Sequence, residues 1–143
     1  TQSNVGLEVN TGRDANGDLP DITITIAMNL TQFGLYDRVS VMAHEIGHGL
    51  GFRTELFDFE QDYSTMTSWD QFLSFPNGTT GPAAFNGPEA VALYGGPVPI
   101  TGYYNSTHPN GIGSIMDPSF GQGEVRVVGL LDRAMMHDIG VLV

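Results

Sequence analysis

The alternation of apolar and polar residues predicts one strand and two helices along this chain. Over residues 22–28 apolar and polar side chains alternate with period two, which predicts a strand with a buried isoleucine face. Over residues 35–50 apolar side chains recur every three or four positions, so we expect an amphipathic helix that ends at the glycines that follow. Residues 125–139 show the same spacing and predict a second amphipathic helix near the C-terminal end.

The segment between the two predicted helices is dense in Gly, Pro, Asn and Thr. Residues 88–93 could form one or two helical turns there, and a short helix is expected near residues 68–73. Long loops in compact domains are usually functional or clamped. We expect Trp69 and Phe72 to anchor this segment to the body of the protein. The 143 residues contain no internal repeat and are predicted to form a single domain.

The composition and the net charge of the chain argue against several classes of function. Five basic residues, all Arg, against 16 acidic ones give a formal net charge of −11, which argues against binding to nucleic acid or an anionic membrane surface. The chain has no Cys, so disulfides, thiolate metal ligands and thiol catalysis are excluded. No apolar run approaches the roughly 18 residues of a membrane span. A site for a soft metal ion must therefore use the four His residues.

The chemistry-bearing motif is His-Glu-x-x-His at residues 44–48, inside the first predicted helix. Two His four residues apart lie on one helix face, so His44 and His48 can bind the same zinc ion. Glu45 lies beside them, where a carboxylate can act as general base towards a metal-activated water. Chance would give this pattern in roughly 0.5% of chains of this composition. The motif predicts a zinc site with a hydrolytic function.

A catalytic zinc needs a third protein ligand, and the sequence leaves its identity open. The extended motif would place a His at position 54, after Gly51, but Thr54 stands there, and a hydroxyl is a poor zinc ligand. The remaining imidazoles are His108, in a loop rich in small polar residues, and His137, in the C-terminal helix pattern. The interpretation of His137 as an ordinary helix residue is favoured.

Residues 44–52, His108 and the segment Ser114-Ile115-Met116-Asp117-Pro118 together resemble the metzincin clan of zinc metallopeptidases. The long spacing between Gly51 and the next candidate His is similar to leishmanolysin-like enzymes. The resemblance implies zinc bound by His44, His48 and His108, with Met116 in a tight turn beneath the metal and Gly51 in structural support.

The same resemblance implies the fold and the divisions of the domain. The fold would be α+β and zincin-like, a single catalytic domain over residues 1–143. Its expected parts are an upstream sheet in 1–34, the active-site helix in 35–50, a loop-rich insertion in 53–107, the third ligand and Met-turn in 108–118, and the C-terminal helix in 125–139.

Two other functions compete with this interpretation. In gluzincin peptidases the third ligand is a Glu on a later helix, and Glu89 is the candidate here. A zinc-stabilised binding module without activity is the second alternative, although a structural zinc does not need Glu45. Apart from zinc, the oxygen side chains of Asp14, Asn16 and Asp18 are spaced two apart like the start of a calcium loop, so calcium is a further candidate cofactor.

The expected partner is a peptide or protein substrate, with neither nucleic acid nor a membrane span involved. We expect the protein to be secreted, because it is acidic, has no Cys to protect from oxidation, and resembles exported peptidases.

Overall fold

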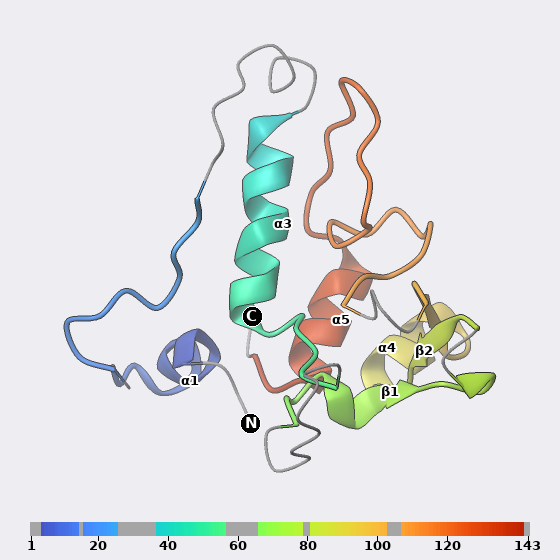
Figure 1. The fold of residues 1–143 in the computed structure, drawn as a ribbon, viewed down its shortest axis with the longest axis horizontal. Helices are drawn as coiled ribbons and strands as arrows, with labels where there is room; N and C mark the ends of the chain where they lie inside the picture. Colours follow the sequence, from blue (N-terminus) through green and yellow to red (C-terminus); the bar gives the residue numbers. More distant parts are fainter. Residues whose placement is uncertain are drawn as a thin grey trace.

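The computed structural model describes residues 4–14, 16–25, 37–56, 66–78, 81–102 and 107–141. These residues form a small α+β fold, as predicted, with four α-helices and one three-stranded antiparallel sheet (Figure 1). The helices in the described part are α1 (Asn4–Thr11), α3 (Arg38–Leu50), α4 (Pro88–Tyr94) and α5 (Leu130–Asp138), and a short 3-10 turn, η2, spans Asp70–Phe72. In these residues no helix is long and apolar enough to cross a membrane.

Helix α3 carries the His-Glu-x-x-His motif, and local chemistry sets both of its ends. The Asp37 carboxylate accepts the Ser40 backbone N–H (2.7 Å) and hydroxyl (2.6 Å), which caps the helix. At the other end Gly51 has φ +139°, a conformation that side-chain-bearing residues rarely adopt. The predicted helix over 35–50 is thus found from residue 38, while residues 35 and 36 lie outside the described part.

The sheet lies in the insertion, in the order β1 (Leu73–Ser74), β2 (Ala83–Phe85), β3 (Val98–Ile100). The outer residues of β2 and β3 are buried, and their central residues are partly exposed. Trp69 is fully buried, and its ring stacks on Phe85 of β2 with a centroid separation of 4.4 Å. The Trp69 ring also packs against Phe52, which precedes the insertion, with ring centroids 4.9 Å apart, so the predicted anchoring by Trp69 is confirmed; Phe72 packs on Phe85 within the insertion.

A sheet upstream of the active-site helix, expected within residues 1–34, is not found in the described part of that region. Helix α1 forms there instead, and it contacts α3. Residues 22–25 run beside α3 in Figure 1 without a ladder partner among the described residues, and 26–28 of the predicted strand lie outside them. The Ile22 side chain lies directly over Gly49, where an added Cβ would be 2.5 Å from Ile22 Cδ1. Packing on a helix thus takes the place of strand pairing.

Helix α5 begins at Leu130, five residues later than predicted. Two contacts hold the preceding chain out of the helix. The Arg126 backbone N–H donates to Ser40 Oγ (2.8 Å), and the Arg126 carbonyl oxygen lies 3.0 Å from the same Oγ, whose proton is donated to Asp37. The Asp132 carboxylate then accepts the Gly129 backbone N–H (2.8 Å), which marks the start of α5.

At its far end α5 fixes the insertion. Asp138 Oδ1 accepts the Glu89 backbone N–H and Oδ2 accepts that of Ala90, both at 2.9 Å, so the last residue of α5 caps α4. Helices α4 and α5 pack against each other, beside the strands, in Figure 1. The core lies between these elements and α3 and includes Phe52, Trp69, Phe85, Val98, Ile100, Ile115, Met116, Met135 and Val141.

Candidate metal centre

Three imidazoles from distant parts of the chain meet in the structure. His44 and His48 project from α3, and His108 reaches them from the loop after β3. The ring centroids of His44 and His48 are 4.8 Å apart, and that of His108 lies 5.2 Å from the first and 4.8 Å from the second. One ligand nitrogen from each ring lies within 4.8 Å of the others. The three His are therefore positioned to bind a metal ion, and their predicted meeting is confirmed.

Backbone carbonyls orient the two rings of α3. His44 Nδ1 lies 2.9 Å from the Ile115 carbonyl oxygen, and His48 Nδ1 lies 2.7 Å from that of Phe52. A carbonyl only accepts, so both Nδ1 atoms carry a proton, and in the neutral form of each ring Nε2 then presents its lone pair. The two Nε2 atoms are 3.2 Å apart. Two lone pairs at this distance repel each other, and a cation bound between them would remove that repulsion.

Gly51 makes the His48 contact possible. Its backbone N–H donates to the carbonyls of Gly47 and His48, both at 3.2 Å, and its positive φ turns the chain back on itself. That turn brings the Phe52 carbonyl to His48 Nδ1. The predicted structural role of Gly51 therefore consists of reversing the chain so that a carbonyl lies behind a ligand ring.

The sheet delivers His108. The His108 carbonyl accepts the Thr101 backbone N–H (2.8 Å), and the Asn110 N–H donates to the Pro99 carbonyl (3.0 Å). Ile100 and Pro109 form an antiparallel bridge between these bonds. Residues 108–110 thus extend the sheet beyond β3, so a ligand 60 residues after His48 has a fixed backbone position.

A tight turn lies against α3 between the two ligand positions. The Asp117 N–H donates to the Ser114 carbonyl (3.2 Å), which closes a turn with the fully buried Met116 inside it. A Cβ added at Gly47 would lie only 2.3 Å from Met116 Sδ. The turn therefore contacts the helix surface between His44 and His48, and its Ile115 carbonyl is the one that orients His44.

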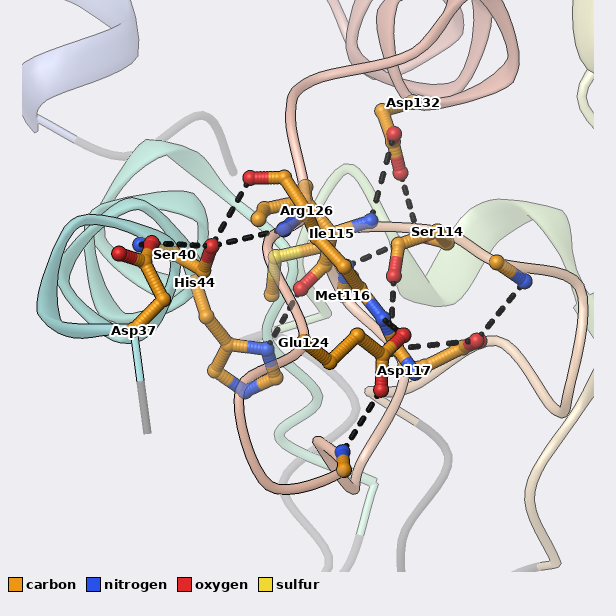
Figure 2. A network of polar contacts seen from close by, with 12 residues as sticks. Asp37, Ser40, His44, Ser114, Ile115, Met116, Asp117, Glu124, Arg126 and Asp132 are labelled. Atoms are coloured by element: carbon orange, nitrogen blue, oxygen red, sulfur yellow. Dashed lines mark hydrogen bonds and ion pairs between the residues drawn. The ribbon is translucent and has the colours of Figure 1, made fainter. Parts of the chain in front are cut away.

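Figure 2 shows the buried polar network that holds this turn. Asp132, 1% exposed, accepts a short hydrogen bond from the Ser114 hydroxyl, and Ser114 Oγ accepts the Met116 N–H (2.9 Å). Asp117 Oδ2 accepts the Gly113 N–H (2.9 Å). These carboxylates keep the turn in position because each satisfies backbone or hydroxyl donors that burial would otherwise leave unpaired.

Arg126 connects this network to His44. Its guanidinium donates to the Ser114 carbonyl (3.1 Å), pairs with Asp117 (3.3 Å), and lies 4.7 Å from the centre of the Phe120 ring. Phe120 in turn packs edge-on against His44, with ring centroids 5.6 Å apart. Sequence reasoning missed Arg126, Asp132 and Ser40, because each of them also contacts a residue that lies 12 to 86 positions away in the sequence.

Burial dominates the electrostatics of His44. The residue is 7% exposed, and desolvation lowers its pKa below the ordinary value, while the bond to the Ile115 carbonyl and the nearby Glu45 carboxylate oppose that shift. A lowered pKa keeps the imidazole neutral, which is the form that binds metal. Glu45 itself is exposed on α3 and is not a member of the ligand cluster.

The other sequence candidates lie elsewhere. Thr54 Oγ1 accepts the Leu56 N–H (3.2 Å). Glu89 Oε1 pairs with His137 Nδ1 (2.5 Å) on the exposed surface where α4 meets α5, so neither residue is grouped with His44 and His48.

The calcium candidates form a turn. Asp14 Oδ1 accepts the backbone N–H groups of Asn16 (3.0 Å) and Gly17 (2.6 Å), and Asn16 Nδ2 donates to the Leu19 carbonyl (3.1 Å). Asp18 is exposed beside them. These bonds account for the spacing of the oxygen side chains as an Asp/Asn turn, and calcium binding stays a prediction.

Neither models of known protein families, nor characterised proteins, nor solved structures give a match to this chain. The function of this chain is therefore inferred from the geometry of its own residues.

Proposed function

We propose that this protein is a zinc-dependent peptidase that uses His44, His48 and His108 as metal ligands and Glu45 as general base. The observation that carries the proposal is the convergence of three imidazoles on one point beside an exposed helix carboxylate. Structural zinc sites are usually closed by four protein ligands, whereas catalytic sites use three and leave a position open. In the part of the chain that the structure describes, the cluster has three such ligands.

The donor set fits zinc. Neutral imidazoles fixed by hydrogen bonds at Nδ1 are typical zinc ligands. The Nε2 atoms of His44 and His48 lie 3.2 Å apart, where their lone pairs can bind one cation. When bound, zinc polarises a carbonyl group and makes water nucleophilic near neutral pH.

The residues of the chain supply the remaining chemistry. Glu45 follows His44 directly on α3, its side chain is exposed, and its charge acts on the pKa of His44, so the carboxylate lies near the cluster. Its carboxylate accepts the proton of the attacking water and passes it to the leaving amine nitrogen. The buried turn around Met116 and the network of Arg126 hold His44 in place while this happens. A peptide or protein is the proposed substrate, and secretion stays a prediction.

The test combines metal analysis with a cleavage assay on a mixed peptide library read by mass spectrometry. We expect the zinc-loaded protein to cleave peptides, and a chelator to stop it. Glu45→Gln should keep zinc, because the amide retains the shape, but lower turnover by roughly 10²–10⁴-fold. Near-native turnover in that variant would show that the proposed base is wrong.

Ligand variants separate the alternatives. His108→Ala should sharply weaken zinc binding, and His137→Ala is the matched control that should not, because His137 pairs with Glu89 at the surface. If Glu89→Ala lost zinc and His108→Ala kept it, the gluzincin-type ligand set would replace ours. If the wild-type protein bound zinc tightly and cleaved nothing in the library, the inactive binding module would be favoured.

A further inference from the structure

The three ligand rings are oriented by two different kinds of partner. His44 Nδ1 and His48 Nδ1 each contact a backbone carbonyl, whereas His108 Nδ1 lies 2.8 Å from the side-chain hydroxyl oxygen of Thr107. A carbonyl dictates the protonated nitrogen, and no substitution at its own residue removes it. A hydroxyl is supplied by one side chain, and a substitution can delete it.

The hydroxyl acts on the ring of His108 and not on its backbone. The His108 carbonyl accepts both the Thr101 N–H (2.8 Å) and the Thr101 hydroxyl (3.1 Å), and the bridge between Ile100 and Pro109 fixes the next residue. These contacts to β3 do not involve the Thr107 side chain. What Thr107 controls is therefore the rotation of the imidazole about its side-chain bonds.

The role of His108 as a metal ligand determines whether His108 Nδ1 or Thr107 Oγ1 is the donor in their hydrogen bond. A His that offers Nε2 to a metal must carry its proton on Nδ1, as His44 and His48 do. Thr107 Oγ1 can accept that proton, which gives His108 the same tautomer as its two partners. Hydrogen bonds of this kind raise the basicity of the ligand and fix the ring plane, and losing one typically weakens metal binding 10–100-fold.

We propose that Thr107 is a positioning residue of the metal centre, whose hydroxyl accepts from His108 Nδ1–H and turns Nε2 towards His44 and His48. The inference rests on the metal site of the proposed function, but it does not require that the protein cleaves peptides. Two independent readouts therefore test it, one with metal and one without.

The variants are matched by shape. Thr107→Val has nearly the same volume and lacks the hydroxyl, and Thr107→Ser retains the hydroxyl. Thr11→Val is the control, since it deletes an exposed hydroxyl at the end of α1 that donates to the Leu7 carbonyl. If Thr107→Val does not fold, as judged by circular dichroism, Thr107→Ala serves as the second variant without a hydroxyl.

The first readout is Zn²⁺ affinity by competition with a chromophoric chelator, together with the visible spectrum of the Co²⁺-loaded protein. We expect Thr107→Val to bind Zn²⁺ roughly 10–100-fold more weakly and to change the Co²⁺ spectrum. Thr107→Ser and Thr11→Val should stay within about threefold of the wild type. Unchanged affinity and spectrum in Thr107→Val would overturn the proposal, as would equal losses in the Val and Ser variants.

The second readout is the tautomer of His108 in the metal-free protein, from ¹⁵N NMR of the imidazole nitrogens. We expect protonated Nδ1 in the wild type and in Thr107→Ser, and a mixture of tautomers in Thr107→Val. A wild-type His108 with its proton on Nε2 would refute the inference even if zinc binds. Conversely, a protein that binds zinc without cleaving peptides would contradict the peptidase and leave the role of Thr107 intact.

Discussion

Gly47 offers a test in which helix propensity and packing predict opposite signs. It lies on the buried face of α3 between the two ligands of the motif. At an open helix position Gly→Ala stabilises a protein by about 1 kcal/mol, because Ala loses less conformational freedom on folding. At Gly47, however, the added Cβ would lie 2.3 Å from Met116 Sδ and 3.1 Å from its Cε. We expect Gly47→Ala to destabilise the protein.

The size of the effect follows from the displacement that the new methyl group demands. Optimal contact between carbon-sized atoms is about 3.5–4.0 Å, so the sulfur must move by about 1.2–1.7 Å. Met is flexible, but Met116 is fully buried and the backbone N–H of the same residue is bonded to Ser114. Overpacking of this kind costs about 1–3 kcal/mol, which exceeds the gain in propensity and leaves a net loss of about 1 kcal/mol.

Urea denaturation of the metal-free protein measures this loss, and thermal unfolding should show it as a drop in Tm of roughly 3–5 °C. Val39→Ala is the control, because Val39 is 77% exposed on the same helix and Ala has the higher helix propensity. A double variant with Met116→Ala should recover the clash component relative to Met116→Ala alone. If Gly47→Ala raised stability as the control does, Met116 would not pack against α3 as described.

Two further predictions concern charge. Arg126→Met should lower the free energy of unfolding by about 3 kcal/mol, because it leaves the Asp117 carboxylate, whose side chain is 4% exposed, buried without its partner. In a double-mutant cycle measured by urea denaturation, adding Asp117→Asn should restore part of that loss. Additive effects of the two substitutions would contradict the pairing. The bonds from Ser40 lower the pKa of Asp37 below its usual 3.8, so the stability that this carboxylate contributes is complete above about pH 4 and is lost as the pH falls through the lowered pKa. The gap between the urea midpoints of wild type and Asp37→Ala should therefore be constant near neutral pH and shrink below about pH 4, and a gap independent of pH would refute the charged cap.

The parts of the site that sequence predicts are those encoded locally. The four-residue spacing of His44 and His48 places both rings on one face of α3, and the apolar period predicted that helix. His108 was assigned through its place ahead of residues 114–118, by resemblance to a family, and not from any local pattern. The structure adds the reason that this assignment could succeed, since residues 108–110 extend a sheet and are not a free loop.

The predictions of secondary structure were wrong where the apolar residues on which they rested are not buried. The predicted start of the C-terminal helix rested on an apolar spacing, but Val125, Val127 and Leu130 are 68%, 73% and 71% exposed. The strands of the insertion contain two or three residues each, which is too short for an alternating pattern to show. In residues 22–25 the alternation is real, with the isoleucines less exposed than the threonines, but it reflects packing on α3.

One contact series explains how a ligand carried by the insertion keeps its position relative to two ligands on a helix. Phe52 has two functions at once, because its carbonyl orients His48 and its ring packs against Trp69 at 4.9 Å. Trp69 stacks on Phe85, which lies in β2. Strand β2 pairs with β3, and Pro109 forms a bridge to the other edge of β3. Since every ring in this series is fully buried, none can move without opening a void, and voids of side-chain size cost several kcal/mol. The insertion is therefore held rigidly relative to α3. The apolar stack that anchors it begins at Phe52, whose carbonyl orients His48, and ends at the sheet that positions His108.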